Sequence, residues 1–269
     1  MGIINFFRNL RKPKKIKIGL ALGSGGAKGF AELGAIRAFE DNGISFDCIA
    51  GTSIGSIVGA FLADGYSSTD IYELISSVNF SEITNLLMIK MDTTGMFRVI
   101  DRTIGSLDIE ELKKPFACVA TEINSGEERI FKSGNVAIAL CASSSFPPFF
   151  KPVIIDNERY VDGAFSNSVP ADLVREMGAD YVIGIDLSDH QPSKNGILNR
   201  LFPTYKGKTE EPWKKGYDYS DIMLKPDLRG YKAVSFRSGA EMFDIGYKTA
   251  LDEIPTIKQN LAKLQKKKK

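Results

Sequence analysis

Histidine and cysteine are scarce in this sequence of 269 residues, which contains one histidine and three cysteines. An odd number of cysteines without metal-type spacing argues against a disulfide framework and a zinc site. We therefore expect Cys48, Cys118 and Cys141 to be buried free thiols in a reducing compartment. The single histidine, His190, limits the choice of a catalytic base to this residue or a carboxylate.

Long apolar runs are also missing. No run approaches the roughly 18 residues that a membrane-spanning helix needs, and the N-terminus lacks the long apolar core and cleavage site of a signal peptide. We therefore expect a cytoplasmic protein. With a formal net charge of only +2, no nucleic-acid partner is predicted, and the oligomeric state is left open.

Positive charge is concentrated at the two ends of the chain. The first 17 residues contain no acid but six basic side chains, Arg8, Arg11, Lys12, Lys14, Lys15 and Lys17, and the chain ends in lysines from Lys266 to Lys269. Apolar residues before Pro13 follow the spacing of an amphipathic helix. We expect these basic N- and C-terminal segments to contact a membrane surface, at its inner face. A frayed or self-docked tail is the alternative.

Strand, loop and helix alternate in the first part of the sequence. Residues 15–22 are a strand candidate that leads into the glycine-rich stretch GSGGAKG, and residues 27–41 follow with helical spacing. The unit recurs as strand FDCIA, turn GTSIG and an apolar helix over residues 54–63. Two consecutive units of this kind predict an α/β domain in three layers, with a parallel-rich central sheet flanked by helices. Further on, strands are expected in a pair turning at Ser125-Gly126 and in a hairpin turning at Asp156-Asn157.

Ser53 stands in Gly51-Thr-Ser53-Ile-Gly55, between the second predicted strand and its helix. A serine at such a turn has a strained backbone and an exposed Oγ, and glycines two before and two after it allow the strand and helix to pass closely. The pattern G-x-S-x-G alone occurs by chance, but the flanking elements strengthen it. We interpret Ser53 as a nucleophile, with a simple turn as the alternative.

The glycine-rich loop before the first helix suits an oxyanion site. Attack of a serine on an ester creates an oxyanion that needs N–H donors, and Gly25 and Gly26 are well placed to supply them. The same loop also suits a phosphate, because Gly23, Gly25 and Gly29 match a loose G-x-G-x-x-x-G. The stricter dinucleotide pattern would need glycine where Lys28 stands. Nucleotide binding therefore remains an alternative.

The base for Ser53 decides the class of site. The order Ser53, Asp162, His190 superficially fits an α/β-hydrolase triad, but only one βα unit precedes Ser53 and His190 lies in an unpatterned stretch. Asp162, in VDGAFSNSVP, ends a predicted strand. A carboxylate with a pKa of about 3.9 is a weak base, and direct hydrogen bonding in a dry site offsets part of that deficit. A structural turn aspartate is the alternative reading.

Three segments together resemble a bacterial patatin-like phospholipase, namely residues 20–65, ASSSFPPFFKPV and YVDGAFSNSVP. The motifs G-G-x-[KR]-G, G-x-S-x-G and D-G-[GA] occur in that family's order, and the similarity runs from about residue 16 to 187. The resemblance implies a dyad of Ser53 and Asp162, oxyanion amides at Gly25 and Gly26, and hydrolysis of phospholipid or lysophospholipid esters through an acyl-enzyme, without metal or cofactor. The supporting motif residues are Gly23, Lys28, Gly29, Gly51, Gly55, Gly163 and Asn167. Ser24, where a further glycine is common, leaves open which amides form the oxyanion site.

The chain divides on this reading into a basic amphipathic segment over 1–14, a patatin-like catalytic domain over 15–189 and a long loop or lid over 190–232. Helices of the same domain follow over 233–269, interrupted at Pro255 and ending in the lysine tail. We expect Asn167 to order the loop that presents Asp162. Residues 86–97 and the segment SFPPFF line either an acyl groove or the core.

Three other functions stay open. An acyltransferase would use the same site, although malonyl-type transferases favour a histidine where Thr52 stands. A nucleotide-binding regulatory module would use the glycine loop. A membrane-docking protein would keep the fold with an inactive site.

Overall fold

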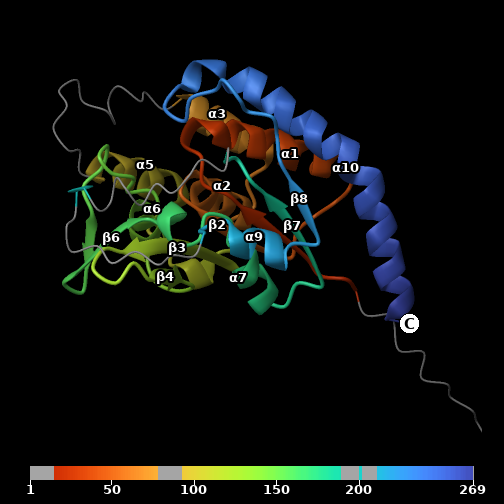
Figure 1. The fold of residues 1–269 in the computed structure, drawn as a ribbon, viewed down its shortest axis with the longest axis horizontal. Coiled ribbons are helices and arrows are strands. Elements are labelled where there is room, and N and C mark those ends of the chain that lie inside the picture. The colour runs from red at the N-terminus through yellow and green to blue at the C-terminus, as the bar shows by residue number, and fades with distance from the viewer. Residues whose placement is uncertain (1–14, 78–92, 189–199, 202–210, 269) are drawn as a thin grey trace, which may run out of the picture.

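The structure, a computed structural model, describes residues 15–77, 93–188, 200–201 and 211–268 (Figure 1). Its first two βα units are those that the sequence predicts, and β1 pairs in parallel with β2. Helix α2 has the predicted bounds, whereas α1 starts at Gly29 because Gly26–Lys28 forms a 3₁₀ turn. The elements are β1 (Ile18–Leu22), α1 (Gly29–Asp41), β2 (Cys48–Thr52) and α2 (Ile54–Ala63).

One mixed sheet contains eight strands of the described residues, in the order β5-β6-β3-β2-β1-β7-β8, with β4 paired to β3. The run from β3 to β8 is parallel. Strands β4, β5 and β6 make antiparallel pairs at the other end. The predicted α/β class with a parallel-rich sheet is therefore correct. The remaining strands are β3 (Phe116–Glu122), β4 (Glu128–Phe131), β5 (Val153–Ile155), β6 (Glu158–Asp162), β7 (Tyr181–Ile185) and β8 (Ile222–Leu224).

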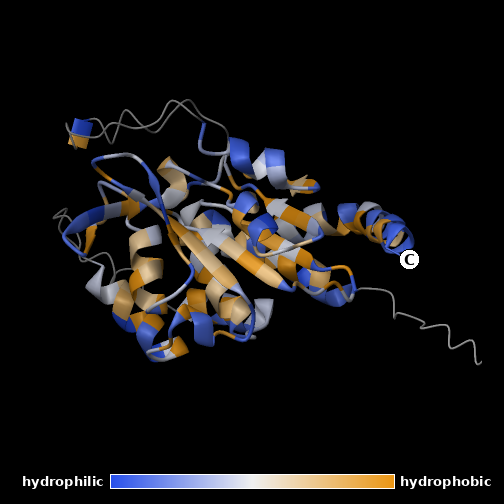
Figure 2. Cartoon of the chain, turned by 90° about the horizontal axis from the view of Figure 1, so that it is seen from below, coloured by the Kyte–Doolittle hydropathy of each residue, from blue (hydrophilic) through white to orange (hydrophobic). Residues whose placement is uncertain are grey.

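Helices cover both faces of the sheet, which gives three layers (Figure 1). Helices α2 and α6 pack on one face, with α1 against α2, while α7 and α9 pack on the other. The strands alternate their buried side chains between the two resulting cores, and they are mostly orange in the hydropathy colouring of Figure 2. The other helices are α3 (Ser68–Ser77), α5 (Thr94–Ile104), α6 (Val136–Ser143), α7 (Ala171–Glu176), α9 (Lys214–Tyr219) and α10 (Gly239–Lys267).

Strands β2 and β6 share one edge of β3. Cys118 and Val119 of β3 pair with both β2 and β4, so β2 and β4 lie on opposite edges. Ala120 and Thr121 pair with both β4 and β6, so β6 lies on the edge of β2. Because β6 is antiparallel to β3 and β2 is parallel to it, the carboxyl ends of β2 and β6 meet head to head beside Ala120. This register brings together residues that are far apart in the sequence.

The predicted hairpin turn at Asp156-Asn157 is confirmed. Both residues have positive φ, 52° and 65°, as a two-residue turn between antiparallel strands favours. The strand pair that turns near Gly126 is confirmed as β3 and β4. The three cysteines are free and buried, as expected.

The predicted interruption at Pro255 is wrong, because α10 continues through this residue to Lys267. Proline removes one hydrogen bond to the carbonyl four residues earlier, here that of Leu251. Pro255 lies on the exposed side of α10 and Leu251 is 42% exposed, so water can satisfy this carbonyl. Figure 1 shows α10 running along α1 and extending beyond the sheet.

The expected long loop over residues 190–232 is wrong in its second half. Residues 214–219 form α9, and residues 222–224 form β8, which adds to the parallel edge of the sheet beside β7. Both elements are too short for their periodicity to be read from the sequence. His190, the rest of 189–199, residues 202–210 and the basic segment 1–14 lie outside the described residues. So do residues 86–92 of the segment 86–97 that is expected to line an acyl groove or the core. Within the described ranges, no helix combines the length and apolar character that a membrane span requires.

Candidate active site

Ser53 occupies the turn between β2 and α2 in a backbone conformation that side chains rarely adopt, with φ 57° and ψ −126°. Such a conformation is strained and must be held by its surroundings. The Ser53 N–H donates to Ser143 Oγ at 2.9 Å. The Ser53 carbonyl accepts from Ser56 Oγ at 2.6 Å. These bonds fix the turn on both sides, and the side chain sits at the N-terminus of α2, where the helix dipole favours negative charge.

Glycines are required where this turn meets its neighbours. A Cβ on Gly51 would lie 2.1 Å from the Gly55 carbonyl oxygen. A Cβ on Gly163 would lie 2.2 Å from the Val119 carbonyl oxygen. The first contact lets α2 fold back over β2, and the second lets the chain after β6 lie against β3. The spacing G-x-S-x-G and the glycine after Asp162 therefore follow from close backbone approach.

Asp162 ends β6 and is 1% exposed. Ser53 Oγ donates to Asp162 Oδ2 at 2.6 Å, and the Ala164 N–H donates to Asp162 Oδ1 at 2.8 Å. The Asp162 carbonyl accepts from Thr121 Oγ1 at 3.0 Å. One carboxylate oxygen is thus held by backbone and the other is directed at the serine, 109 residues away in sequence.

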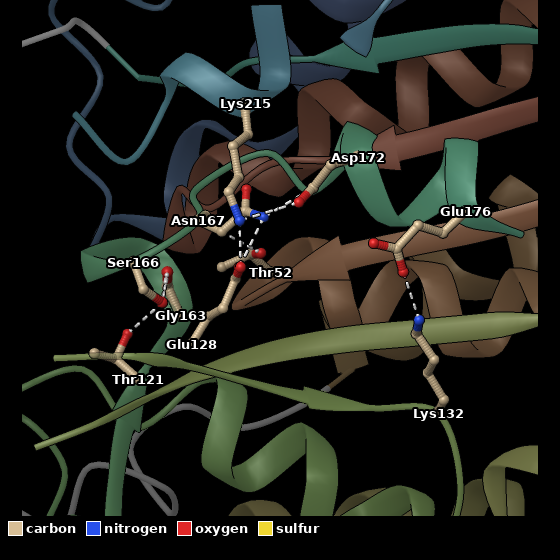
Figure 3. Close-up of polar contacts among 10 residues, drawn as sticks. All are labelled: Thr52, Thr121, Glu128, Lys132, Gly163, Ser166, Asn167, Asp172, Glu176 and Lys215. Atoms are coloured by element: carbon tan, nitrogen blue, oxygen red, sulfur yellow. Dashed lines mark hydrogen bonds and ion pairs between the residues drawn. The ribbon is translucent and has the colours of Figure 1, made fainter. Parts of the chain in front are cut away.

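Residues 163–170, called here the Asp162 loop, connect the site to three other parts of the chain. Thr52 Oγ1 donates to the Asn167 carbonyl at 2.8 Å, beside the Ser53 turn. The Ser24 N–H of the glycine loop donates to the Ser168 carbonyl at 3.0 Å. Asn167 is fully buried, and its Nδ2 donates to Glu128 Oε2 and Asp172 Oδ1 (Figure 3). Asn167 thus contacts β2, β4 and α7 from within the Asp162 loop.

The glycine loop lies at the carboxyl end of β1, next to Ser53. Gly26 and Ser53 line the same cavity, whereas Gly25 packs against Leu187. Among the described residues, no acceptor is found for the N–H groups of Gly25 and Gly26. Gly23 contacts the Ile185 backbone and Gly55, and a Cβ on Gly29 would strike Ile54. The Lys28 side chain is buried at the start of α1.

An apolar cavity of about 320 Å³ opens beside Ser53. Its lining includes apolar side chains of α2, α3 and α5, three residues of the segment before α10 (Ala233, Val234 and Phe236), and Phe149 and Phe150. Ile100 and Phe61 are buried in its wall, while Phe149 and Val234 are exposed at 47% and 61%. Ser144 also lines it, and the described chain offers its buried Oγ no hydrogen-bond partner. Helix α5, which includes Phe97, contributes to both cavity and core, and the segment SFPPFF lines the cavity with Phe149 and Phe150 and packs on the core with Phe146.

Several residues around the site escape sequence reasoning. Nothing in the sequence distinguishes Ser143, Thr121 and Lys215 from other polar residues. Their contacts in the folded chain show that they lie around the site. Glu32, in α1, is completely buried, and this burial raises the pKa of its carboxyl well above the usual value. In the sequence, the only indication that Glu32 is buried is its position among apolar residues of the helix. Within the described part of the chain, no group of His, Cys, Asp and Glu side chains is arranged to hold a metal ion.

The fold and site define an α/β protein with a serine on a strained strand–helix turn in direct contact with a buried aspartate. The family model described as "Patatin-like phospholipase" matches residues 20–175, more than half of the chain. The chain belongs to the patatin-like phospholipase family.

Curated relatives have names consistent with this family. The chain is 30% identical to the human "Patatin-like phospholipase domain-containing protein 6", over 86% of this chain and 20% of that protein. It is 27% identical to "Neuropathy target esterase sws" of Drosophila melanogaster, over 86% of this chain and 19% of that protein. It is 26% identical to "Lysophospholipase NTE1" of Pyricularia oryzae, over 94% of this chain and 19% of that protein. The chain thus spans about a fifth of the length of these relatives.

Solved structures share the fold at low sequence identity. VipD from Legionella pneumophila aligns with a TM-score of 0.63 at 14% identity, covering 90% of this chain and 67% of that chain. The type III effector ExoU aligns with a TM-score of 0.51 at 11% identity, covering 91% of this chain and 54% of that chain. These two proteins therefore share the fold of this chain at 14% and 11% sequence identity.

The Ser143 hydroxyl is expected to stabilise the strained turn. In Ser143→Ala the buried N–H of Ser53 loses its acceptor, and we expect unfolding to become easier by about 1–3 kcal/mol. Ser144→Ala is the matched control, because the neighbouring hydroxyl has no hydrogen-bond partner among the described residues. Urea unfolding of the two variants and the wild type measures the difference. Equal stability of the two variants would show that the Ser53–Ser143 bond has no net effect.

Proposed function

We propose that this chain is a serine lipid acyl hydrolase that cleaves acyl esters of phospholipids or lysophospholipids. The observation that carries the proposal is the 2.6 Å hydrogen bond from Ser53 Oγ to Asp162 Oδ2 at the strained turn. Family membership and the apolar cavity beside Ser53 support a lipid acyl chain as the group that is bound. In this proposal Ser53 and Asp162 act as a catalytic dyad.

Acylation begins with attack of Ser53 Oγ on the ester carbonyl carbon. Asp162 Oδ2 accepts the serine proton as the new C–O bond forms, since it is already the hydrogen-bond partner of that hydroxyl. The Ala164 N–H bond to Oδ1 keeps the other oxygen aimed at the serine. The ester C–O bond then breaks, and Asp162 returns the proton to the departing alcohol. Ser53 is left as an acyl ester.

The negative charge on the carbonyl oxygen needs donors during this attack. The N–H groups of Gly25 and Gly26 are suited to this role, because no described residue accepts from them and Gly26 faces the cavity with Ser53. The N-terminus of α2 adds a favourable field. The amide of Ser53 itself is engaged with Ser143. The glycine loop is therefore the main source of donors in this proposal.

Deacylation uses the same carboxylate a second time. Asp162 accepts a proton from a water molecule, which attacks the acyl carbon of the Ser53 ester. When the tetrahedral intermediate collapses, the bond to Oγ breaks, Asp162 returns the proton to Ser53 and the fatty acid leaves. The serine and the aspartate then regain their starting contact.

The dyad is tested by ester hydrolysis in three variants. We expect Ser53→Ala to lower kcat/KM by at least about 10³-fold because the nucleophile is lost. Asp162→Asn removes the proton acceptor, and a loss of about 10²- to 10⁴-fold is expected. His190→Gln should retain wild-type turnover, since Ser53 contacts Asp162 directly. Hydrolysis of a chromogenic medium-chain ester measures all three.

The same assay separates the alternatives. Loss of activity in a normally folded His190→Gln variant would favour a triad of Ser53, Asp162 and His190 over the dyad. Transfer to an added alcohol that exceeds release of free fatty acid would favour an acyltransferase. Absence of hydrolysis by the wild type, together with measurable nucleotide affinity, would favour a nucleotide-binding module and overturn the proposal.

Cavity depth is expected to set the acyl-chain preference. Ile100 is 3% exposed and lines the cavity from α5. An indole at this position in Ile100→Trp would occupy space that a long acyl chain needs. Because one methylene in an apolar pocket changes rates by roughly 10- to 200-fold, the ratio of kcat/KM for long over short esters should fall by at least about tenfold. Ile138→Trp, at an exposed position of α6 outside the lining, is the control. An unchanged ratio in Ile100→Trp would contradict acyl binding in this cavity.

We further propose that the protein takes its substrate from a membrane surface. Phe149 and Val234 are exposed and line the cavity, so they mark its mouth as a site of contact with lipid. The basic N- and C-terminal segments would add attraction to anionic lipid. The C-terminal end of α10 lies at the opposite end of the molecule from α5 (Figure 1). The cavity mouth and the C-terminal lysines would therefore be two distinct points of contact with lipid.

Vesicles of mixed neutral and anionic phospholipid test the mouth. The double variant Phe149→Ser/Val234→Ser is expected to bind vesicles at least about tenfold more weakly, because it loses two apolar side chains from the interface. Because both residues also line the cavity, activity of the variant on a soluble short-chain ester is measured as well, to show whether the cavity itself has changed. Leu251→Ser removes a similar exposed apolar side chain from α10 and should bind normally. Equal binding by the two variants would contradict docking through the mouth.

A further inference from the structure

Lys215 of α9 lies between two carboxylates from different parts of the sheet assembly. Its Nζ forms ion pairs with Glu128 of β4 and, at 3.2 Å, with Asp172 of α7. Figure 3 shows Lys215 reaching down from α9 toward both side chains. The Lys215 side chain is 36% exposed, while those of Glu128 and Asp172 are 23% and 12% exposed. This is a partly buried three-residue charge network.

The same two carboxylates hold Asn167. Asn167 Nδ2 donates to Glu128 Oε2 at 3.1 Å and to Asp172 Oδ1 at 2.9 Å. Asn167 is completely buried, and its carbonyl accepts the hydroxyl of Thr52, the residue before Ser53. The network therefore ends on the backbone next to the nucleophile and within the loop that follows Asp162.

Two carboxylates that share one amide nitrogen repel each other unless a cation is present. Burial alone lowers the pKa of Lys215, but its hydrogen bond to Glu128 and the charge of Asp172 outweigh this and raise the pKa above its usual value. Lys215 is thus a stable cation at neutral pH. Without it, Glu128 and Asp172 would move apart, and Asn167 would lose at least one acceptor.

Backbone contacts join α9 to the same loop. The Ser168 N–H donates to the carbonyl of Pro212, just before α9, at 2.9 Å. Gly216 packs so closely on Val169 that a Cβ there would lie 2.7 Å from the valine Cβ. The Ser168 carbonyl in turn accepts from Ser24 of the glycine loop. Displacement of α9 would therefore reach both Asp162 and the glycine loop.

We propose that Lys215 is a positioning residue that holds the Asp162 loop, and with it the Asp162 carboxylate, in register with Ser53. The inference rests on the proposed hydrolase function for its kinetic consequence, whereas its structural consequence is independent of any activity. It also gives α9, which lies in the segment expected to be a loop or lid, a role in the catalytic framework. Lys215 itself does not touch the reacting atoms.

The ion pair Lys132–Glu176, between the end of β4 and α7, offers a nearby control. Lys132 follows β4 and bonds Glu176, at the end of α7, at 2.8 Å, with the two side chains 47% and 58% exposed. Figure 3 shows this pair apart from the network around Asn167. Removal of Lys132 thus deletes a Lys–Glu pair between the same strand and helix regions without changing the charges around Asn167.

The kinetic test compares Lys215→Met, Lys215→Arg and Lys132→Met on a soluble ester. A displacement of about 1 Å in a catalytic group can lower rates by about 10²-fold, so we expect kcat of Lys215→Met to fall roughly 10- to 100-fold with little change in KM. Lys215→Arg keeps the cation and should recover most of this loss. Lys132→Met should match the wild type. Adding Glu128→Gln to Lys215→Met removes the repulsion and should restore part of kcat.

Hydrogen exchange in the absence of substrate gives a readout that does not depend on activity. The N–H groups of Ala164 and Asn167 donate within the turn after Asp162, to Asp162 Oδ1 and to the Gly163 carbonyl. We expect both to exchange at least about tenfold faster in Lys215→Met than in Lys132→Met, at temperatures where both variants are fully folded. Equal exchange in the two variants would overturn the proposal. If the wild type is active and Lys215→Met has the same kcat, the proposal is also overturned. If the wild type is inactive, the hydrolase function is overturned, and the exchange result alone decides the role of Lys215.

Discussion

The site depends on one constraint, the head-to-head meeting of β2 and β6 along a single edge of β3. A strand edge has a limited number of backbone groups. Along this edge β2 pairs with β3 up to Val119, and β6, running the opposite way, ends where Asp162 pairs with Ala120. The residues that follow β2 and end β6 must therefore lie side by side. This places the hydroxyl of Ser53 against the carboxylate of Asp162. A slip of either strand by one residue would turn the side chain to the opposite face of the sheet.

The Asp162 loop fixes the positions of Ser53 and Asp162 relative to each other. It is bonded to the end of β2 through Thr52, to the glycine loop through Ser24, and through Ser168 to the Pro212 carbonyl just before α9. Lys215 of α9 reaches it indirectly, through the two carboxylates that accept from Asn167. Each contact satisfies a polar group that is buried or partly buried, and an unpaired group of that kind costs about 1–3 kcal/mol. The loop is thus held from three directions. Rigidity of this kind keeps the Asp162 carboxylate in a fixed direction relative to the Ser53 hydroxyl.

Most of the parallel half of the fold and the principal site residues were predictable from the sequence. The two βα units have long, strongly periodic segments, and the glycines around Ser53 and after Asp162 mark close backbone contacts that no larger residue permits. By contrast, β8 has three residues and α9 has six, which is too few for a period to be recognised. The continuity of α10 through Pro255 was missed because helix breaking depends on whether the freed carbonyl faces water.

The strands and helices around Ser53 and the residue types of the site can be read from local patterns, because hydrophobic period and glycine spacing are properties of short segments. The side chains that surround Ser53 and Asp162 depend instead on how distant segments pack. The bond from Ser143 to the Ser53 amide, the cavity beside Ser53 and the network of Lys215, Glu128 and Asp172 join segments that are far apart in sequence. Such contacts are set by strand register and helix packing, and no local pattern of residues encodes them.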